Sequence, residues 1–267
     1  MLRFDVITIF PDFFESPHSV GVVGRALSSG IAECHTHDLR NWTHDRHRTV
    51  DDRPFGGGEG MVMKPEPICA AVESLQLTPK AQRDPKQTVI LLSAQGERFT
   101  QSVAHELAQM DRVVFICGRY EGVDERVSEL LCDRELSVGD YVLSGGELGA
   151  AIIVDAVVRL LPGVLGNADS ARFESFGRDD ASLPLADLDA PRAVHGSGGL
   201  LDYPHYTRPV DFNGHTVPEV LTGGDHALIR KWRRQQALRK TERNRPDLLE
   251  KAELSAEDMR LLGEELD

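Results

Sequence analysis

Short apolar runs alternate with amphipathic segments along the first two thirds of the chain. The runs have the β-branched and apolar composition of buried strands, at Phe4–Phe10, Ile31–His35, Thr88–Ser93 and Arg112–Cys117. Helical periodicity separates or follows them, at Val20–Ser28, Pro65–Leu75, Gln101–Gln109 and Glu147–Leu161. This alternation predicts βαβ units and an α/β fold with a parallel sheet covered on both faces.

Glycine-rich turns follow the predicted strands. In parallel sheets ligands bind beyond the carboxyl ends of strands, so the segments Ser93–Gly96, Gly118–Glu121 and Val138–Gly146 are expected to meet at one crevice. Glycine has no Cβ, which lets backbone amides and carbonyls approach a flat ligand closely. The pattern favours backbone recognition of a nucleoside-like group, and ordinary turn chemistry is the alternative.

The pattern changes after Gly166. Residues 167–199 are rich in Ser, Asp, Gly and Pro and lack periodicity, which predicts a linker that is mobile until substrate orders it. A smaller helical domain follows, in which Asp225 is a good N-cap for a basic helix through Leu238, and Ser255 with Asp258 begins a final helix. The expected organisation is therefore a domain at 1–166, a linker at 167–199 and a helical domain at 200–267.

Overall charge argues against a nucleic-acid partner, but its distribution does not. The 267 residues carry a formal net charge of −13. Basic residues nevertheless cluster between Arg230 and Arg245, while 247–267 is mainly acidic. Charge fields act over about 8 to 10 Å, so a basic helix can bind phosphate on an acidic protein. A solvated helix face is the alternative.

A polar loop at Leu39–Phe55 has no helical periodicity and ends at Gly56–Gly58. Its mixed charges fit two structures equally well. One is a surface network in which opposite charges pair with one another. The other is a phosphate-binding loop, in which arginine side chains and the amides of the three glycines hold anions.

Cysteines and hydropathy narrow the class of protein. The four cysteines lack CxxC spacing and are expected to be small buried hydrophobes in a reducing compartment. Cys34, His35 and His37 have poor spacing for zinc, so no metal site is expected there. No apolar run of about 18 residues exists and the first residues resemble a strand rather than a signal peptide, so a cytoplasmic protein without membrane association is expected.

Long motifs carry a family resemblance. Residues 117–126 and 137–148 have the sequences CGRYEGVDER and SVGDYVLSGGEL. With THDRHRTVDDRPFGGG at 43–58, PGVLG at 162–166 and LDYPHYTRP at 201–209, they resemble the bacterial tRNA (guanine-N1)-methyltransferases of the SPOUT superfamily. These blocks are spread over nearly the whole chain.

The resemblance implies a fold and a cofactor. It implies a SPOUT-type parallel sheet with a C-terminal trefoil knot, where periodicity alone predicts an unknotted sheet, and a homodimer with shared active sites and the helix before Pro162 in its interface. The threaded loops would bind S-adenosylmethionine, at positions matching Leu92, Ser93, Gln95, Gly118, Tyr120, Glu121, Val138, Gly139, Asp140, Tyr141, Val142, Leu143, Gly145 and Gly146.

Two catalytic residues follow from the same resemblance. Arg159 matches the family's arginine and would stabilise charge on guanine O6, with an interface salt bridge to Asp155 as the alternative. The family has an aspartate before Ser-Phe in the linker, and here Glu174 occupies that position as the expected base. Other linker acids could replace it, namely Asp169, Asp179 or Asp180. No residue pattern requires a metal, but the family's dependence on magnesium makes Mg²⁺ a cofactor to test.

The expected substrate is tRNA, methylated at N1 of guanine 37, next to the anticodon. Methylation of another RNA base, or non-catalytic RNA binding, are alternative hypotheses. The expected tRNA contacts come from the polar loop, the turn after Tyr203 and the basic helix, at His47, Arg48, Asp51, Arg53, His205, Arg208, Arg230 and Arg234.

Overall fold

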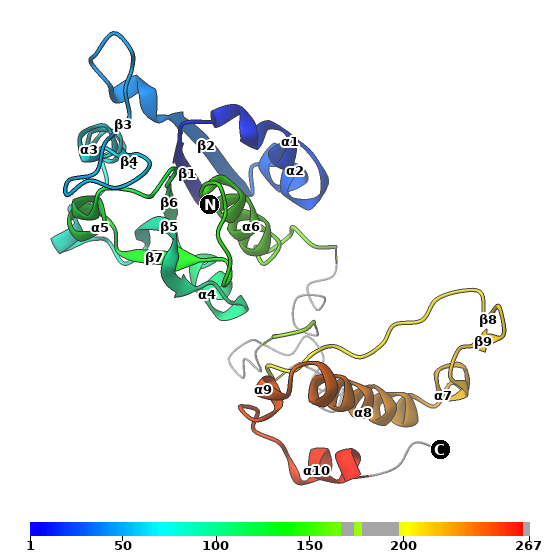
Figure 1. The fold of residues 1–267 in the computed structure, drawn as a ribbon. Coiled ribbons are helices and arrows are strands. Elements are labelled where there is room, and N and C mark those ends of the chain that lie inside the picture. The colour runs from blue at the N-terminus through cyan, green and yellow to red at the C-terminus, as the bar shows by residue number, and fades with distance from the viewer. Residues whose placement is uncertain (167–173, 178–197, 264–267) are drawn as a thin grey trace. The chain divides into compact units, whose positions relative to one another are not determined.

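The computed structural model describes residues 1–166, 174–177 and 198–263 (Figure 1). Backbone contacts divide the chain into two compact units, Met1–Gly166 and Asn167–Asp267. Each unit has its own buried apolar side chains, so each can be described separately. Within the described ranges, every helix is too short or too polar to cross a lipid bilayer.

A five-stranded sheet with only parallel pairings forms the centre of the first unit. Its strand order is β2-β1-β6-β5-β7. The strands are β1 Leu2–Thr8, β2 Ala32–Asp38, β5 Gln87–Arg98, β6 Arg112–Cys117 and β7 Arg134–Ser137. The predicted α/β class with a parallel sheet is confirmed, because the apolar runs at β1, β5 and β6 are buried on both faces.

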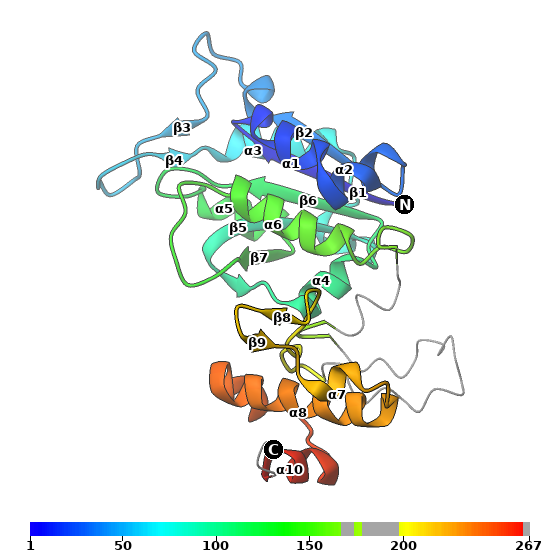
Figure 2. The ribbon, with the colours of Figure 1, turned by 90° about the vertical axis from the view of Figure 1, so that its right-hand side faces the viewer.

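Helices cover both faces of this sheet (Figures 1 and 2). Alternate side chains of β6 enter different cores, Phe115 with Phe4 on one face and Val114 with Ile7 on the other. On the Phe115 face pack α2 Gly21–Ser28, α4 Gln101–Leu107 and α6 Glu147–Val158. Helices α3 Pro65–Ser74 and α5 Glu125–Leu131 pack on the Val114 face. The other short helices of this unit are η1 Pro11–Phe14, α1 Glu15–Ser19, η2 Leu39–Trp42 and η3 Lys80–Gln82.

Strand β5 is longer than predicted. The sequence predicts that the strand ends at Ser93, but β5 continues to Arg98. Both Leu92 and Glu97 align with Leu136 of β7, so the residues between them bulge out of the ladder. The predicted strand end is wrong, and Ser93–Gly96 is an irregular stretch within β5 rather than a loop after it.

Several small elements carry no clear sequence signal. Strand β7 is missing from the prediction, as is a hairpin in which β3 Asp51–Asp52, near the end of the polar loop, pairs with β4 Val62–Met63 beyond it. Arg134 at the start of β7 lies 2.9 Å from Glu97 and 3.0 Å from Glu106. Four residues that include two charged side chains have no alternating pattern, so the edge strand escapes detection.

The second unit is organised around helix α8, His226–Asn244. Asp225 caps it, accepting from the N–H groups of Ala227 and Leu228, as the sequence predicts. Ser255 and Asp258 form the predicted capping box of α10, since each side chain bonds the other's backbone N–H. The other elements are β8 Asp211–Phe212, β9 His215–Thr216, α7 Glu219–Thr222, α9 Pro246–Leu249 and α10 Ala256–Gly263.

A buried carboxylate ties three strands of the sheet together. Asp5 of β1 is fully buried and accepts from Arg3 at 3.0 Å, from Arg112 of β6 at 2.7 Å and pairs with His37 of β2 at 2.7 Å. Burial alone raises the pKa of Asp5, but the hydrogen bonds from His37, Arg3 and Arg112 outweigh it and hold that pKa well below its usual range.

We expect Asp5→Asn to lower the free energy of unfolding by about 3 kcal/mol at neutral pH, because it removes the buried carboxylate that pairs with the half-buried guanidinium groups of Arg3 and Arg112. The folded pKa lies below the unfolded one, so the ionic contribution is full above the unfolded pKa and is lost as pH falls below about 4. Urea unfolding of both proteins at several pH values measures this.

Asp111→Asn is the matched control, because Asp111 is exposed at the end of the same sheet. It should change stability by less than about 0.5 kcal/mol. An Asp5→Asn protein as stable as wild type at pH 7, or a stability difference that grows as the pH falls, contradicts the role given to Asp5.

Candidate active site

A cavity of about 360 Å³ lies at the carboxyl ends of β6 and β7 and at the irregular stretch of β5. This is the crevice at which the three glycine-rich segments are expected to meet. Of the fourteen positions predicted for the cofactor, only Gly139 and Asp140 do not line it. The lining positions are Leu92, Ser93, Gln95, Gly118, Tyr120, Glu121, Val138, Tyr141, Val142, Leu143, Gly145 and Gly146.

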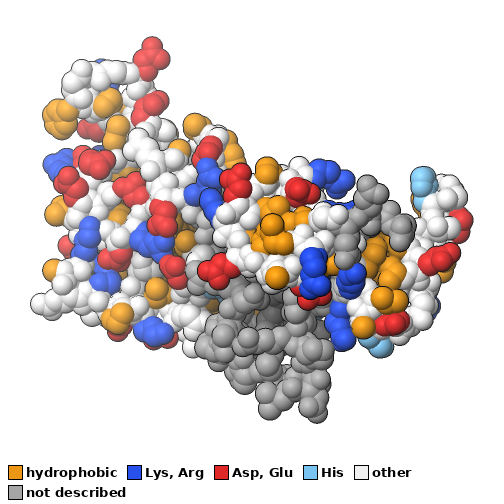
Figure 3. Space-filling model, turned by 90° about the horizontal axis from the view of Figure 1, so that it is seen from below, with side chains coloured by type: hydrophobic (Ala, Val, Ile, Leu, Met, Phe, Trp, Pro, Cys, Tyr) orange, Lys and Arg blue, Asp and Glu red, His pale blue; other side chains and the backbone are white. Residues whose placement is uncertain are grey.

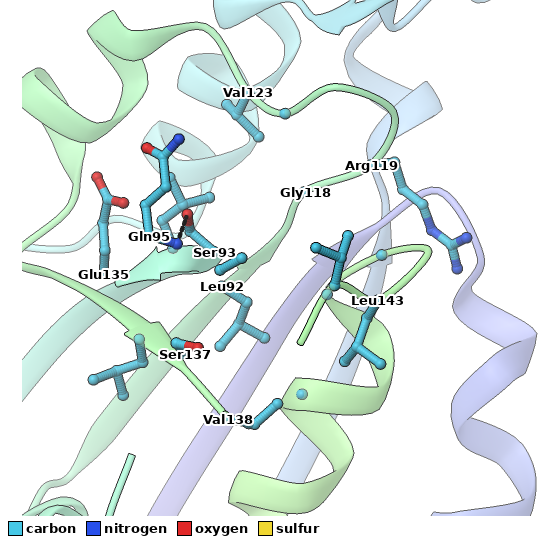
Figure 4. A pocket seen from close by; sticks show the side chains of 18 of the residues that line it. Leu92, Ser93, Gln95, Gly118, Arg119, Val123, Glu135, Ser137, Val138 and Leu143 are labelled. Carbon is cyan, nitrogen blue, oxygen red and sulfur yellow. Dashed lines mark hydrogen bonds between the residues drawn. The ribbon is translucent and has the colours of Figure 1, made fainter. Parts of the chain in front are cut away.

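Apolar and polar side chains occupy different parts of this cavity. Figure 4 shows Gln95 and Glu135 on one side and Arg119 on the other, with Leu92 and Leu143 between them. The polar groups can orient a ligand, and the apolar groups can cover a flat ring. The cavity therefore has the chemistry of a site for a nucleoside-sized molecule.

Glycine is required where the two loops touch. The N–H of Gly146 donates to the carbonyl of Gly118 at 2.9 Å, and Arg119 forms an isolated antiparallel bridge with Gly145. A Cβ on Gly146 would lie 2.7 Å from the Cα of Cys117. These contacts leave no room for a side chain and bring the backbone of both loops to the cavity wall.

A buried ion pair supports the same loops. Glu147, at the start of α6, is only 1% exposed and accepts from the guanidinium Nε of Arg119 at 2.9 Å and from the hydroxyl of Thr8 at 2.7 Å. Arg119 also donates to the carbonyl of Ser144 at 3.1 Å, and its guanidinium lies 4.5 Å from the ring centroid of Phe10. The side chain of Glu147 in α6 thereby holds both Thr8 at the end of β1 and Arg119 in the loop after β6.

Three residues that line the cavity come from the strand absent from the prediction. Glu135, Leu136 and Ser137 belong to β7. Arg119 also lines the cavity and could have been inferred from its place inside the glycine-rich segment. Asp140 lies outside because its carboxylate, 81% exposed, pairs with Arg98 at 2.5 Å.

The polar loop contacts the cavity loop through its hairpin. Met63 donates its N–H to the carbonyl of Gly122 at 2.9 Å, and Glu121 donates to the carbonyl of Met61 at 3.0 Å. Burial, followed by a hydrogen bond with Asp51, raises the pKa of Tyr120. The expected tRNA residue Asp51 and the expected cofactor residue Tyr120 are therefore neighbours.

Inside the polar loop, both predicted structures have some support. Asp45 bonds the backbone N–H groups of His47 and Thr49, at 3.1 and 2.9 Å, rather than an arginine. Arg48 donates to the side chain of Asn41 at 2.7 Å and lies 3.8 Å from Asp38. His47 and Arg53 are exposed at the loop surface.

The two expected catalytic residues lie in different units. Arg159 follows the last turn of α6, where its N–H donates to the carbonyl of Asp155 at 3.3 Å. At about 1.5 Å per residue, the helix separates it from Gly146 in the cavity by about 20 Å. The structure therefore does not bring Arg159 to the cavity of its own chain.

Glu174 belongs to a short segment held within the second unit. The N–H of Phe176 donates to the carbonyl of Leu200 at 2.9 Å, and the hydroxyl of Ser175 accepts from the N–H of Asp202 at 2.9 Å. The buried Leu200 packs with Leu238 of α8. The alternative acids lie outside the described residues, namely Asp169, Asp179 and Asp180.

The positively charged side chains of the basic helix, α8, differ in how exposed they are. Arg234 is buried and forms a two-point ion pair with Asp258 of α10, at 2.7 and 2.9 Å. The expectation that Arg234 contacts tRNA is not supported by this geometry, because its guanidinium is bound inside the unit. Arg230 is half-buried, and His205 and Arg208 are exposed on the turn after Tyr203.

Among residues 1–166, 174–177 and 198–263, no group of three His, Cys, Asp or Glu side chains is placed to hold a metal ion. Burial raises the pKa of the Cys34 thiol to about 12, so this cysteine is a poor ligand at neutral pH.

Comparisons with known proteins confirm the family resemblance. The family model for tRNA (guanine-1)-methyltransferase TrmD matches residues 2–251. A relative from Koribacter versatilis is 59% identical over 263 residues, covering 98% of both chains. Relatives from Dictyoglomus turgidum and Geobacter metallireducens are 50% and 48% identical, covering 99% and 98% of this chain and 96% and 97% of their own. All three are named tRNA (guanine-N(1)-)-methyltransferase, and this chain belongs to the TrmD family.

Proposed function

We propose that this chain transfers a methyl group from S-adenosylmethionine to N1 of guanine 37 in tRNA. The observation that carries the proposal is the cavity at the ends of β6 and β7 and the irregular stretch of β5, which is lined by twelve of the fourteen positions that match the family's cofactor site. Family membership supports the reaction class and the methyl donor. Since tRNA is the substrate, the proposed compartment is the cytoplasm.

The residues of the cavity fit S-adenosylmethionine. Backbone groups around Gly118 and Gly146 are close enough to one another to hold an adenine edge, while Leu92 and Leu143 supply apolar cover for the ring. Glu121 offers a carboxylate to the cationic end of the donor. When bound, the cofactor supplies an activated methyl group on a positively charged sulfur.

The chemistry needs a base and a cation. Methylation forms a bond between N1 and the methyl carbon, breaks the bond between that carbon and sulfur, and leaves its electron pair on sulfur. We assign the N1 proton to the carboxylate of Glu174, and the charge that spreads onto O6 to the guanidinium of Arg159. Glutamate is one methylene longer than the family's aspartate, so its backbone must lie slightly farther from the guanine.

Shared active sites in a homodimer agree with these positions. Arg159 lies about 20 Å along α6 from the cavity of its own chain, too far to reach it. Leu148 and Ile152 are large apolar side chains that α6 exposes, 48% and 45% respectively, one helical turn apart. We propose that a second copy covers this face and supplies its Arg159 to the cavity.

The topology near the cavity agrees with the family's knot. Strand β7 pairs beside β5, and the chain then returns so that Gly146 bonds Gly118. We propose that this return threads as a trefoil knot. We also propose the organisation of a methyl-transfer domain at 1–166, a linker at 167–199 and a tRNA-binding domain at 200–267.

Substrate contacts are proposed for the exposed loop and the second unit. Phosphate contacts would position the anticodon stem while base contacts specify the guanine. The proposed residues are His47, Arg48, Asp51, Arg53, His205, Arg208 and Arg230, without the buried Arg234.

The deciding assay uses methyl-labelled cofactor and unmodified tRNA with guanine or adenine at position 37. Label should enter only the guanine transcript, and digestion should place it in 1-methylguanosine. Label in another nucleoside supports methylation of a different base. Binding of tRNA without incorporation supports a non-catalytic factor. Two parallel reactions, one with EDTA and one with EDTA and an excess of Mg²⁺, test whether the reaction requires the metal.

We expect Arg159→Ala to lower the turnover number by about 10² to 10³, because the charge on O6 loses its cation. The dissociation constant for S-adenosylmethionine, measured by calorimetry, should stay within about twofold, and Arg159→Lys should recover part of the rate. A large loss of cofactor affinity would show that Arg159 belongs to the cofactor site instead.

We expect Glu174→Gln to lower turnover by about 10² or more, since an amide of the same shape cannot accept the N1 proton. Glu174→Asp restores the family's residue and should keep most of the activity. Single-turnover rates with saturating tRNA and cofactor measure both effects. Wild-type rates in Glu174→Gln would assign the base to another acid, which Asp169→Asn, Asp179→Asn and Asp180→Asn would identify.

Mixed dimers test whether a partner supplies Arg159. Gly146→Ala should disrupt the cavity, because its Cβ would lie 2.7 Å from the Cα of Cys117, a backbone atom inside the sheet. Co-expressed with Arg159→Ala under separate affinity tags, it should form mixed dimers with one intact site and about half the wild-type activity. If the cavity and Arg159 of one chain act together, the mixed dimers stay inactive.

A further inference from the structure

The second unit contains a cavity of its own, of about 400 Å³. We call it the Tyr203 pocket, and its size falls in the range of about 300 to 1,000 Å³ that is typical of sites for small ligands. The pocket is lined by Tyr203, Pro204, His205, Tyr206, Thr207, Arg208, Val210, Val217, Leu221, Thr222 and Arg233.

Aromatic rings and aliphatic side chains form its walls. The rings of Tyr203 and His205 lie 4.6 Å apart at 43°, and Tyr206 is 50% exposed. Val210 and Val217 are the aliphatic residues of the β8–β9 region. Walls of this kind bind flat, weakly polar rings better than they bind compact anions, which need several convergent donors.

Arg233 places a donor between these walls. Its guanidinium carbon lies 4.9 Å from the centroid of the Tyr203 ring, so one face of the guanidinium is stacked. Its Nε is buried, and no described residue accepts a hydrogen bond from it. Arg233 also lines the pocket, so the end of its guanidinium can offer N–H donors to a bound ring.

Hydrogen bonds hold the pocket in shape. The N–H of Leu201 donates to the buried hydroxyl of Thr241 in α8 at 2.9 Å, which fixes the chain just before Tyr203. Asp202 pairs with His205 at 2.9 Å. The N–H of Val217 bonds the carbonyl of Val210 at 2.9 Å. A pocket fixed in this way loses little entropy when a ring enters.

Helix α8, which supplies Arg233 to the pocket, is rich in positively charged residues. Figure 3 shows Lys and Arg side chains beside hydrophobic ones in the right-hand part of the visible face. Helix α8 carries the residues Arg230, Lys231, Arg239, Lys240 and Arg243 in addition to Arg233. Such a field attracts a polyanion, so a nucleic-acid base is favoured over a neutral aromatic metabolite.

We propose that the Tyr203 pocket receives an unpaired purine base of the tRNA, distinct from the guanine that is methylated. The base stacks on the Tyr203 and Tyr206 side, and an acceptor on its edge, such as N7, receives an N–H from the end of the Arg233 guanidinium. This inference rests on the proposed function, because it assumes that tRNA is the substrate. It assigns to Arg233 the role in tRNA recognition that the sequence suggests for its neighbour Arg234.

The test compares tRNA affinity with cofactor affinity. Arg233→Met keeps the length of the side chain but removes the guanidinium donors, and Tyr203→Leu removes the aromatic face. Each should raise the Kd and KM for tRNA about tenfold, as expected for loss of one stacked base, with the Kd for S-adenosylmethionine unchanged. Tyr203→Phe should bind tRNA as wild type does. Arg233→Lys keeps the charge but should restore little affinity.

Arg260→Ala is the matched control, because it removes one exposed positive charge from α10 in the same unit. It should leave tRNA affinity within about twofold. Circular dichroism and the melting temperature verify that each variant is folded, and Tyr203→Phe with Arg233→Lys provide less disruptive forms of the two changes. If Arg233→Met and Tyr203→Leu bind tRNA as wild type does, the inference is overturned while methylation by wild type stands.

Two further measurements identify the occupant. A photo-reactive benzophenone residue at position 206 should crosslink to an unpaired purine other than guanine 37, and crosslinks confined to a paired stem contradict the proposal. Guanosine monophosphate or adenosine monophosphate binding that depends on Arg233, combined with wild-type tRNA affinity in Arg233→Met, would identify a free nucleotide as the ligand and overturn it. If the proposed function itself is wrong, the wild-type protein will not methylate tRNA, and this result differs from every outcome above.

Discussion

The first unit depends on a contact between two backbones that leaves no space for a side chain. Gly146 donates to Gly118 at 2.9 Å, and a Cβ at Gly146 would lie 2.7 Å from Cys117. Because the loops after β6 and β7 meet there, the ends of these two strands and the irregular stretch of β5 are enclosed as a cavity. Without this approach, the loops could not reach the same ligand, and the polar groups on β5 and β7 would line an open surface.

The ion pair between Arg119 and the buried Glu147 reinforces this contact. Arg119 binds Glu147, and its side chain lies against Gly145. The ion pair has an additional partner in Thr8, so the carboxylate is well satisfied by hydrogen bonds. The same side chain therefore shapes the cavity wall and joins it to β1 and α6.

Sequence patterns predicted the elements whose burial is uniform. The strand Arg112–Cys117 is found with the predicted bounds because each residue after Arg112 is buried, so an apolar run suffices to identify it. Strand β7 was missed because Arg134 and Glu135 are charged, and an edge strand of four residues lacks a period. The glycine-rich segments predicted most of the cavity lining, because their spacing shows which loops end beside one another.

Individual side chains on the basic helix were harder to predict. Adjacent helical positions point about 100° apart, so Arg233 reaches the Tyr203 pocket while Arg234 is buried against Asp258. Which of the two arginines is buried depends on where α10 packs. This tertiary contact cannot be predicted from the composition of the helix. Arg159 illustrates the same limit, since its position in the sequence does not indicate that α6 carries it away from the cavity.

The hydrogen bond between Thr8 and Glu147 spans 139 positions of the chain. Strand β1 also lies between β2 and β6, so its second edge stays unpaired until residue 117 has been synthesised. Contacts of such long range form slowly, because a long loop must close before they are made. On the ribosome, the amino-terminal strand therefore waits for the chain to emerge as far as Cys117, and the cavity is completed only when the start of α6 arrives.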